Sequence, residues 1–162
     1  MAKASDIPRL TASTPFAEAA ARTVEVRAAE LFEQSADVLD TEDIERVHDM
    51  RVATRRLRAV LELYAPCFPR GELQVALSDV KALADALGER RDPDVQLAAL
   101  QDLSEHVVQA DHAGLEAFAD RLRAEQQEAN ATLAAALARA TDDDLRGRLD
   151  RLVAAAREQV PA

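Results

Sequence analysis

Apolar residues recur every three or four positions along most of this chain, which is the spacing of an amphipathic α-helix. Cap residues, Pro and Gly divide this pattern into segments. Thr14 with Pro15, and Asp92 with Pro93, resemble helix starts, and Gly88 suits the position after a helix end. Helices are expected over about 15–37, 42–64, 71–87, 93–108, 112–140 and 142–158. We therefore predict an all-α fold, an antiparallel bundle of about five or six helices with short loops.

The composition agrees with this fold class. Ala makes up about a fifth of the 162 residues, aromatic residues make up 3%, and Gly and Pro together number ten. Strands favour β-branched and aromatic residues, so an all-β fold is excluded. Residues 1–13 are expected to form a flexible tail, and 14–160 a single helical domain. No apolar stretch suits a membrane helix or a signal peptide, which favours a cytoplasmic protein.

Charge is unevenly distributed along the chain. The formal net charge is −10, and the basic residues are 18 Arg and 2 Lys. Between positions 46 and 58 five Arg and one Asp give 5 − 1 = +4, so the remaining residues sum to −14. An acidic chain is a poor candidate for a general nucleic-acid binder, but this segment is locally cationic.

The cationic residues of the second expected helix share one face. At 100° per residue four of them fall within a sector of about 80° and extend for about 15 Å. We call them the basic stripe: His48, Arg51, Arg55 and Arg58. Apolar residues including Met50 and Leu57 occupy the opposite face and are expected in the core. Arg56 lies off the stripe.

Like charges at this spacing repel by roughly 0.2–0.5 kcal/mol per pair, so an anion should compensate them. The protein's own Asp and Glu side chains are one candidate. An external anion with several negative groups in a row is the other, and Arg favours it, because a guanidinium engages phosphate through two parallel hydrogen bonds. On the second interpretation the basic stripe faces a hollow that a ligand can enter.

Two segments of the sequence resemble the signature of the CHAD family, the conserved histidine α-helical domain. The first is His48-x-x-Arg51-Val52-x-x-Arg55-Arg56-x-Arg58. The second is Lys81-Ala82-Leu83 followed by Leu87-Gly88-x-x-Arg91-Asp92-x-Asp94-Val95. The resemblance covers about 15–103, and beyond that it rests on helical character alone.

The resemblance implies non-catalytic binding of inorganic polyphosphate, or a similar linear polyanion, and association with polyphosphate granules. By matching positions, the ligand contacts would be His48, Arg51, Arg55, Arg58, Lys81, Arg91 and Arg56. Arg56 could instead pair with Asp92 or Asp94. Family members have two similar helical halves around a shared groove, whereas only one copy of the His/Arg motif is visible here. We therefore expect a half-length member that forms a homodimer to rebuild the groove.

Other functional classes find less support. The alternative is a structural or interaction protein whose Arg-rich helix docks onto an acidic protein partner. The sequence lacks a Walker-type loop, a Gly-x-Ser-x-Gly motif and a His-Glu-x-x-His motif. We therefore expect no catalytic residues, no metal site and no cofactor. Sequence-specific nucleic-acid binding is not expected either, since aromatic residues for base stacking are scarce. Membrane binding is not expected, because no apolar stretch suits a membrane helix.

Overall fold

The computed structural model describes residues 3–160, and this part of the chain is all-α, as predicted. It contains α1 (Phe16–Gln34), α2 (Ile44–Leu63), α3 (Arg70–Ser104), α4 (His112–Asp142) and α5 (Leu145–Glu158). Two short 3₁₀ helices, η1 (Ala65–Cys67) and η2 (Gln109–Asp111), precede α3 and α4. Five α-helices fall within the predicted five or six.

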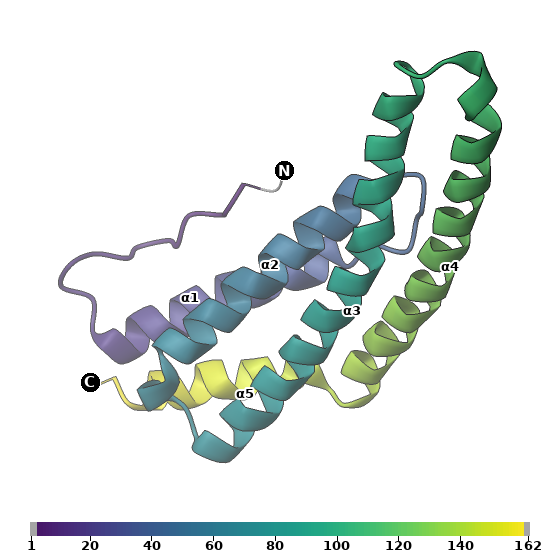
Figure 1. Cartoon of the computed structure of the whole chain (residues 1–162). Helices are drawn as coiled ribbons and strands as arrows, with labels where there is room; N and C mark the ends of the chain where they lie inside the picture. The colour runs from purple at the N-terminus through teal and green to yellow at the C-terminus, as the bar shows by residue number, and fades with distance from the viewer. Residues whose placement is uncertain (1–2, 161–162) are drawn as a thin grey trace.

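The helices form a bundle with a projecting arm (Figure 1). α1 packs against α2 and α5, α2 packs against α3, and α3 packs along α4. The distal halves of α3 and α4 extend beyond the other helices as a two-helix arm (Figure 1). α2 runs antiparallel to α3, and this arrangement positions the candidate site described below.

The core contains the apolar stripe predicted on the second helix. Met50, Leu57 and Leu61 are fully buried in the cluster that fills the bundle, together with Leu31 from α1. Phe16, in the first turn of α1, is 55% exposed and rests against the ring of Tyr64 at a centroid distance of 5.0 Å. Its position in the first turn places it at the edge of the bundle.

The predicted break between two helices at 88–92 is wrong, because α3 is continuous through Gly88 and Pro93. Relative to Ala, Gly disfavours a helix interior by about 1 kcal/mol and Pro by about 3 kcal/mol. Packing along α4 offsets these costs. In addition, Arg90 donates a hydrogen bond to Asp94, both fully buried, so this link spans Pro93 on the same helix. Tertiary contacts therefore override the local helix-stop signals.

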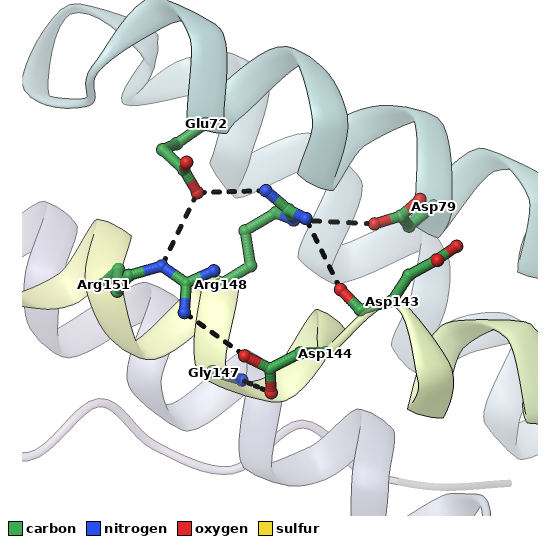
Figure 2. A network of polar contacts seen from close by, with 7 residues as sticks. All are labelled: Glu72, Asp79, Asp143, Asp144, Gly147, Arg148 and Arg151. Carbon is green, nitrogen blue, oxygen red and sulfur yellow. Dashed lines mark hydrogen bonds and ion pairs between the residues drawn. The ribbon is translucent and has the colours of Figure 1, made fainter.

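An ionic network fastens the start of α5 to α3 (Figure 2). Arg148 Nη1 donates to Glu72 Oε2 at 3.1 Å, and its Nε lies 3.7 Å from Asp79 Oδ2. Asp144, in the left-handed region with φ 53°, accepts from the Gly147 amide at 3.2 Å and is the N-cap of α5. The sequence predicted that this helix begins at about 142, three residues before its observed start at Leu145.

The segment that precedes α1 lies along that helix. The Ser5 amide donates to Glu30 Oε1 at 2.5 Å, Arg27 donates to the Ser5 carbonyl at 3.0 Å, and Arg22 donates to the Arg9 carbonyl at 2.6 Å. The flexibility expected for 1–13 stays a prediction. Burial alone raises the pKa of Glu30, but the Ser5 amide and the Arg27 guanidinium outweigh burial and hold this pKa below its ordinary value.

Replacing Glu30 with Gln is expected to lower the free energy of unfolding at pH 7, by an amount that shrinks on acidification. A carboxyl with a lowered folded-state pKa stabilises the fold above its unfolded pKa and loses that contribution as pH falls through the folded pKa. Urea unfolding at pH 7 and pH 3 measures the difference. A constant difference between wild type and Glu30→Gln would contradict this assignment.

Asp79 provides a matched control with the opposite sign. Burial raises its pKa, and Arg148 only partly offsets this. A raised folded-state pKa stabilises the fold below the unfolded pKa and loses that contribution as pH rises. The stability of wild type relative to Asp79→Asn should therefore increase as pH falls, opposite to the trend for Glu30→Gln.

Candidate anion-binding surface

The basic stripe lies on the outward face of α2. Arg51, Arg55 and Arg58 are exposed, and His48 is half-buried near the start of the helix. Met50 and Leu57, on the opposite face, are fully buried. α2 therefore separates its cations from its apolar residues as the sequence predicted, and three guanidinium groups are accessible to a ligand.

The protein's own carboxylates leave most of the stripe uncompensated. The side chains of Arg51 and Arg55 make no ion pair or hydrogen bond with any residue among 3–160. Arg58 Nε lies 2.8 Å from Glu62 Oε1, and these two side chains are 48% and 51% exposed. An exposed pair of this kind contributes about 0–1 kcal/mol and yields readily to a stronger anion. The sequence analysis considered two compensating anions, the protein's own carboxylates and an external anion. Among the three arginines of the stripe, the protein's own carboxylates within residues 3–160 pair only with Arg58.

Two further predicted cations come from α3. Arg91, half-buried, has its Nη1 3.4 Å from the Ile44 carbonyl, to which it donates. Since Ile44 begins α2, this contact places Arg91 one helical turn from the level of His48. Lys81 is exposed, and its Nζ lies 2.7 Å from Asp85 Oδ2.

The predicted cations of α3 and the basic stripe of α2 extend over the same length of helix, side by side, because the two helices pack antiparallel. From Arg91 back to Lys81 is ten residues, about 15 Å of helix, which equals the length from His48 to Arg58 on α2. Arg91 therefore lies at the His48 end, and Lys81 lies toward the Arg58 end. The seven predicted ligand contacts are therefore spread over two adjacent helices, α2 and α3.

Arg56 lies on the other flank of α2. It lines a pocket with Glu30 and Glu33 of α1 and does not join the basic stripe. The predicted pairing of Arg56 with Asp94 is wrong, because Asp94 is fully buried and accepts hydrogen bonds from Arg90 and from Gln126 Nε2, the latter at 2.7 Å.

The sequence missed Arg90, the largest fully buried side chain. Its Nη1 donates to Asp94, and its Nε donates to Asn130 Oδ1 of α4 at 3.1 Å. Asn130 Nδ2 in turn donates to the Leu39 carbonyl, in the loop before α2, at 2.9 Å. This buried network ties α3, α4 and that loop together, and so it holds the start of α2. The sequence signal that could have indicated this ion pair is an Arg four residues before an Asp on the same helix.

The basic stripe is an open surface and not a hollow. Arg51, Arg55 and Arg58 line none of five pockets found among residues 3–160. Their side chains are exposed, so they face solvent and not an enclosed hollow. A ligand on one copy would lie along the helix.

Comparison with known proteins supports the resemblance drawn from the two motifs. The family model for the CHAD domain matches residues 22–162. The chain belongs to the CHAD family. The match extends through α4 and α5, beyond the region where the motifs were recognisable by inspection. No curated protein and no solved structure matches the chain.

The two CHAD motifs of this chain have different physical roles. The His/Arg motif presents cations to solvent on α2. In the second motif Arg91 contacts the start of α2, whereas Asp94 is enclosed in the α3–α4 interface. Within residues 3–160 no helix is long and apolar enough to cross a membrane, and no group of three or more His, Cys, Asp or Glu could hold a metal ion.

Proposed function

We propose that this CHAD-family protein binds inorganic polyphosphate along the basic stripe of α2. The observation that supports the proposal is the exposure of Arg51 and Arg55, in line on one helix face, with no carboxylate partner among the described residues. Membership of the CHAD family agrees with a polyphosphate-type ligand. Association with polyphosphate granules follows as part of the same proposal.

A linear polyanion suits this surface better than a single phosphate. Each charge-assisted hydrogen bond contributes about 1.5–3 kcal/mol, against roughly 0.2–0.5 kcal/mol of repulsion for each like-charged pair. Because the cations follow the helix for about 15 Å, one chain of linked phosphates can contact several of them in succession. Free phosphate contacts one or two of them and so forgoes most of this free energy.

We propose binding without chemical conversion of the ligand. The stripe supplies cations and one histidine. Cys67, the single thiol of the chain, is buried in η1, and burial raises its pKa, which keeps the thiol protonated and unreactive.

Titration of the protein with long-chain polyphosphate tests the proposal. We expect saturable binding that excess free phosphate does not reverse at matched ionic strength, and that weakens as salt rises, because counterions are released on binding. Indifference to polyphosphate, combined with capture of an acidic protein, would overturn the proposal in favour of the interaction-protein alternative.

We further propose that two copies pair, so that each contributes one basic stripe to a shared groove. The open surface over α2 and the single His/Arg helix support this. Light scattering at micromolar concentration should show a particle of twice the 17.6 kDa chain mass, at least when polyphosphate is present. A 17.6 kDa particle both with and without polyphosphate would contradict the homodimer and leave the single-stripe surface as the binding unit.

A further inference from the structure

His48 is the member of the basic stripe whose charge can change near neutral pH. Its side chain is half-buried, and its ring makes no hydrogen bond or ion pair with any residue among 3–160. The other two histidines of the chain, His106 and His112, are exposed at the far end of the arm. An imidazole ordinarily changes charge between pH 5 and 8, whereas a guanidinium stays charged. The charge of the stripe near neutral pH therefore depends on His48.

On α2 itself, the ligand side of His48 is cationic. Arg51 lies about 60° around the helix from His48 and is exposed, without a carboxylate partner among the described residues. The neighbouring carboxylates, Glu45 and Asp49, lie about 60° and 100° around the helix in the other direction, on the side of Arg56. An anion that contacts Arg51 therefore reaches His48 without passing these carboxylates.

The helix α3, which packs against α2, also brings a cation to this end of the stripe. Arg91 donates to the Ile44 carbonyl at 3.4 Å, one turn before His48, and no carboxylate within the described range forms an ion pair with it. The next charged groups of α3 toward the other end of the stripe are Lys81 and Asp85, which pair with each other at 2.7 Å. On this side, too, the unpaired charge is positive.

The acidic groups of the other neighbouring helices are directed elsewhere. Glu30 and Glu33 of α1 line a pocket with Arg56 on the far flank of α2. Asp79, whose pKa burial raises, lies on α3 and faces Arg148 of α5, with its Oδ2 3.7 Å from Nε (Figure 2). A change in the charge of Asp79 therefore acts on the contact between α3 and α5 and not on the stripe.

We propose that polyphosphate binding takes up a proton at His48, so that the stripe binds the polyanion more tightly as pH falls. This inference rests on the proposed function. A protonated ring has two N–H donors and a positive charge, whereas a neutral ring presents one nitrogen lone pair that a phosphate oxygen repels. Without a ligand, the nearby guanidinium groups of Arg51 and Arg91 oppose a further positive charge. A polyanion lying across them removes this opposition.

The affinity and the proton uptake must change together. A ligand that prefers the protonated protein favours protonation by the same free energy by which protonation favours the ligand. Protonation of His48 raises the charge of the stripe from three to four, because its three arginines are charged throughout this pH range. Tighter binding at low pH is therefore expected to come from this one residue.

Calorimetric titration with long-chain polyphosphate at pH 5.5 and pH 8, at one ionic strength, tests the proposal. A long chain is used because only its few end groups titrate near neutral pH. We expect wild type to bind about fivefold more tightly at pH 5.5, which corresponds to one added ionic contact at a partly exposed site. At pH 6.5, titration in two buffers of different ionisation enthalpy is expected to show a net uptake of protons.

Two substitutions at His48 and one matched control locate the titrating group. His48→Gln is expected to lose most of the pH dependence and the proton uptake, because an amide is not protonated in this range. His48→Arg, which carries a fixed charge, is expected to bind at pH 8 nearly as tightly as wild type binds at pH 5.5. The control His106→Gln/His112→Gln is expected to keep the pH dependence of wild type, because both residues lie at the end of the arm.

Equal affinity of wild type at pH 5.5 and pH 8 would overturn this inference and leave the proposed function standing. Full pH dependence in His48→Gln would also overturn it, because the titrating group would then lie elsewhere in the protein. Absence of polyphosphate binding at both pH values would instead overturn the proposed function itself. The failure of the inference and the failure of the proposed function can therefore be told apart.

Discussion

Replacing Arg51, Arg55 and Arg58 together with Ala is expected to weaken polyphosphate binding by about 100-fold or more. Each guanidinium contributes charge-assisted hydrogen bonds to the polyanion, and solvent screening at this exposed surface reduces each contribution to about 1 kcal/mol. Three such losses sum to about 3 kcal/mol, and 1.4 kcal/mol is tenfold in affinity. Titration of wild type and variant with polyphosphate of one defined length measures the change. The fold should survive, since all three side chains are exposed.

A second triple variant distinguishes the effect of the basic stripe on binding from the effect of the protein's net charge. Arg70, Arg121 and Arg139 are exposed residues of α3 and α4, and their replacement with Ala removes the same three charges. We expect this control to weaken binding by less than threefold at physiological salt, because charges beyond a Debye length of about 8 Å are largely screened. If both triple variants lose affinity equally, binding is diffuse and the stripe is not the site. A His48→Ala/Arg51→Ala variant that binds as wild type does would likewise refute this assignment.

The largest expected effect on stability comes from the buried pair Arg90–Asp94. Replacing Asp94 with Ala is expected to lower the free energy of unfolding by about 3–5 kcal/mol, because it leaves the fully buried Arg90 guanidinium without its carboxylate. Gln126 loses its acceptor as well, and Asn130 alone then faces Arg90 from α4. Urea unfolding followed by circular dichroism measures the loss.

The exposed pair Lys81–Asp85 has the same i, i+4 spacing on the same helix and is the matched control. Both of its side chains are about 60% exposed, so Asp85→Ala is expected to cost about 0.5 kcal/mol or less. Equal losses for Asp85→Ala and Asp94→Ala would contradict the role given to the buried network. Replacing Arg90 and Asp94 together with apolar residues should recover part of the stability, because no unpaired charge then stays buried.

These two predictions assign different roles to the two CHAD motifs of this chain, ligand binding to the first and stability of the fold to the second. The His/Arg motif forms a surface that can lose three charges without unfolding. The second motif contributes Asp94 to the core, where Arg90 and Asn130 link the arm to the loop before α2 through the Leu39 carbonyl. A change in this network would therefore alter the orientation of the stripe without touching a ligand contact.

Much of the site could be predicted from sequence because it lies on one helix. Within α2 the positions of Arg51, Arg55 and Arg58 relative to Leu57 follow from 3.6 residues per turn, and the structure agrees. Lys81 and Arg91 came from the family resemblance, and antiparallel packing explains why they accompany α2. The hydrogen bond from Arg91 to Ile44 joins residues 47 positions apart, which no local pattern specifies.

The sequence by itself determined the helical fold, the division of α2 into a cationic and an apolar face, and the family. These features depend on interactions between residues three or four positions apart, which periodicity and caps record. Only the tertiary structure decided that α3 continues through Gly88 and Pro93, that Arg56 faces α1, and that the stripe lies on an open surface. Those outcomes depend on which helices pack together. Burial against α4 outweighs the local preference of a glycine or a proline, and the arginines of the stripe are exposed on the outward face of α2.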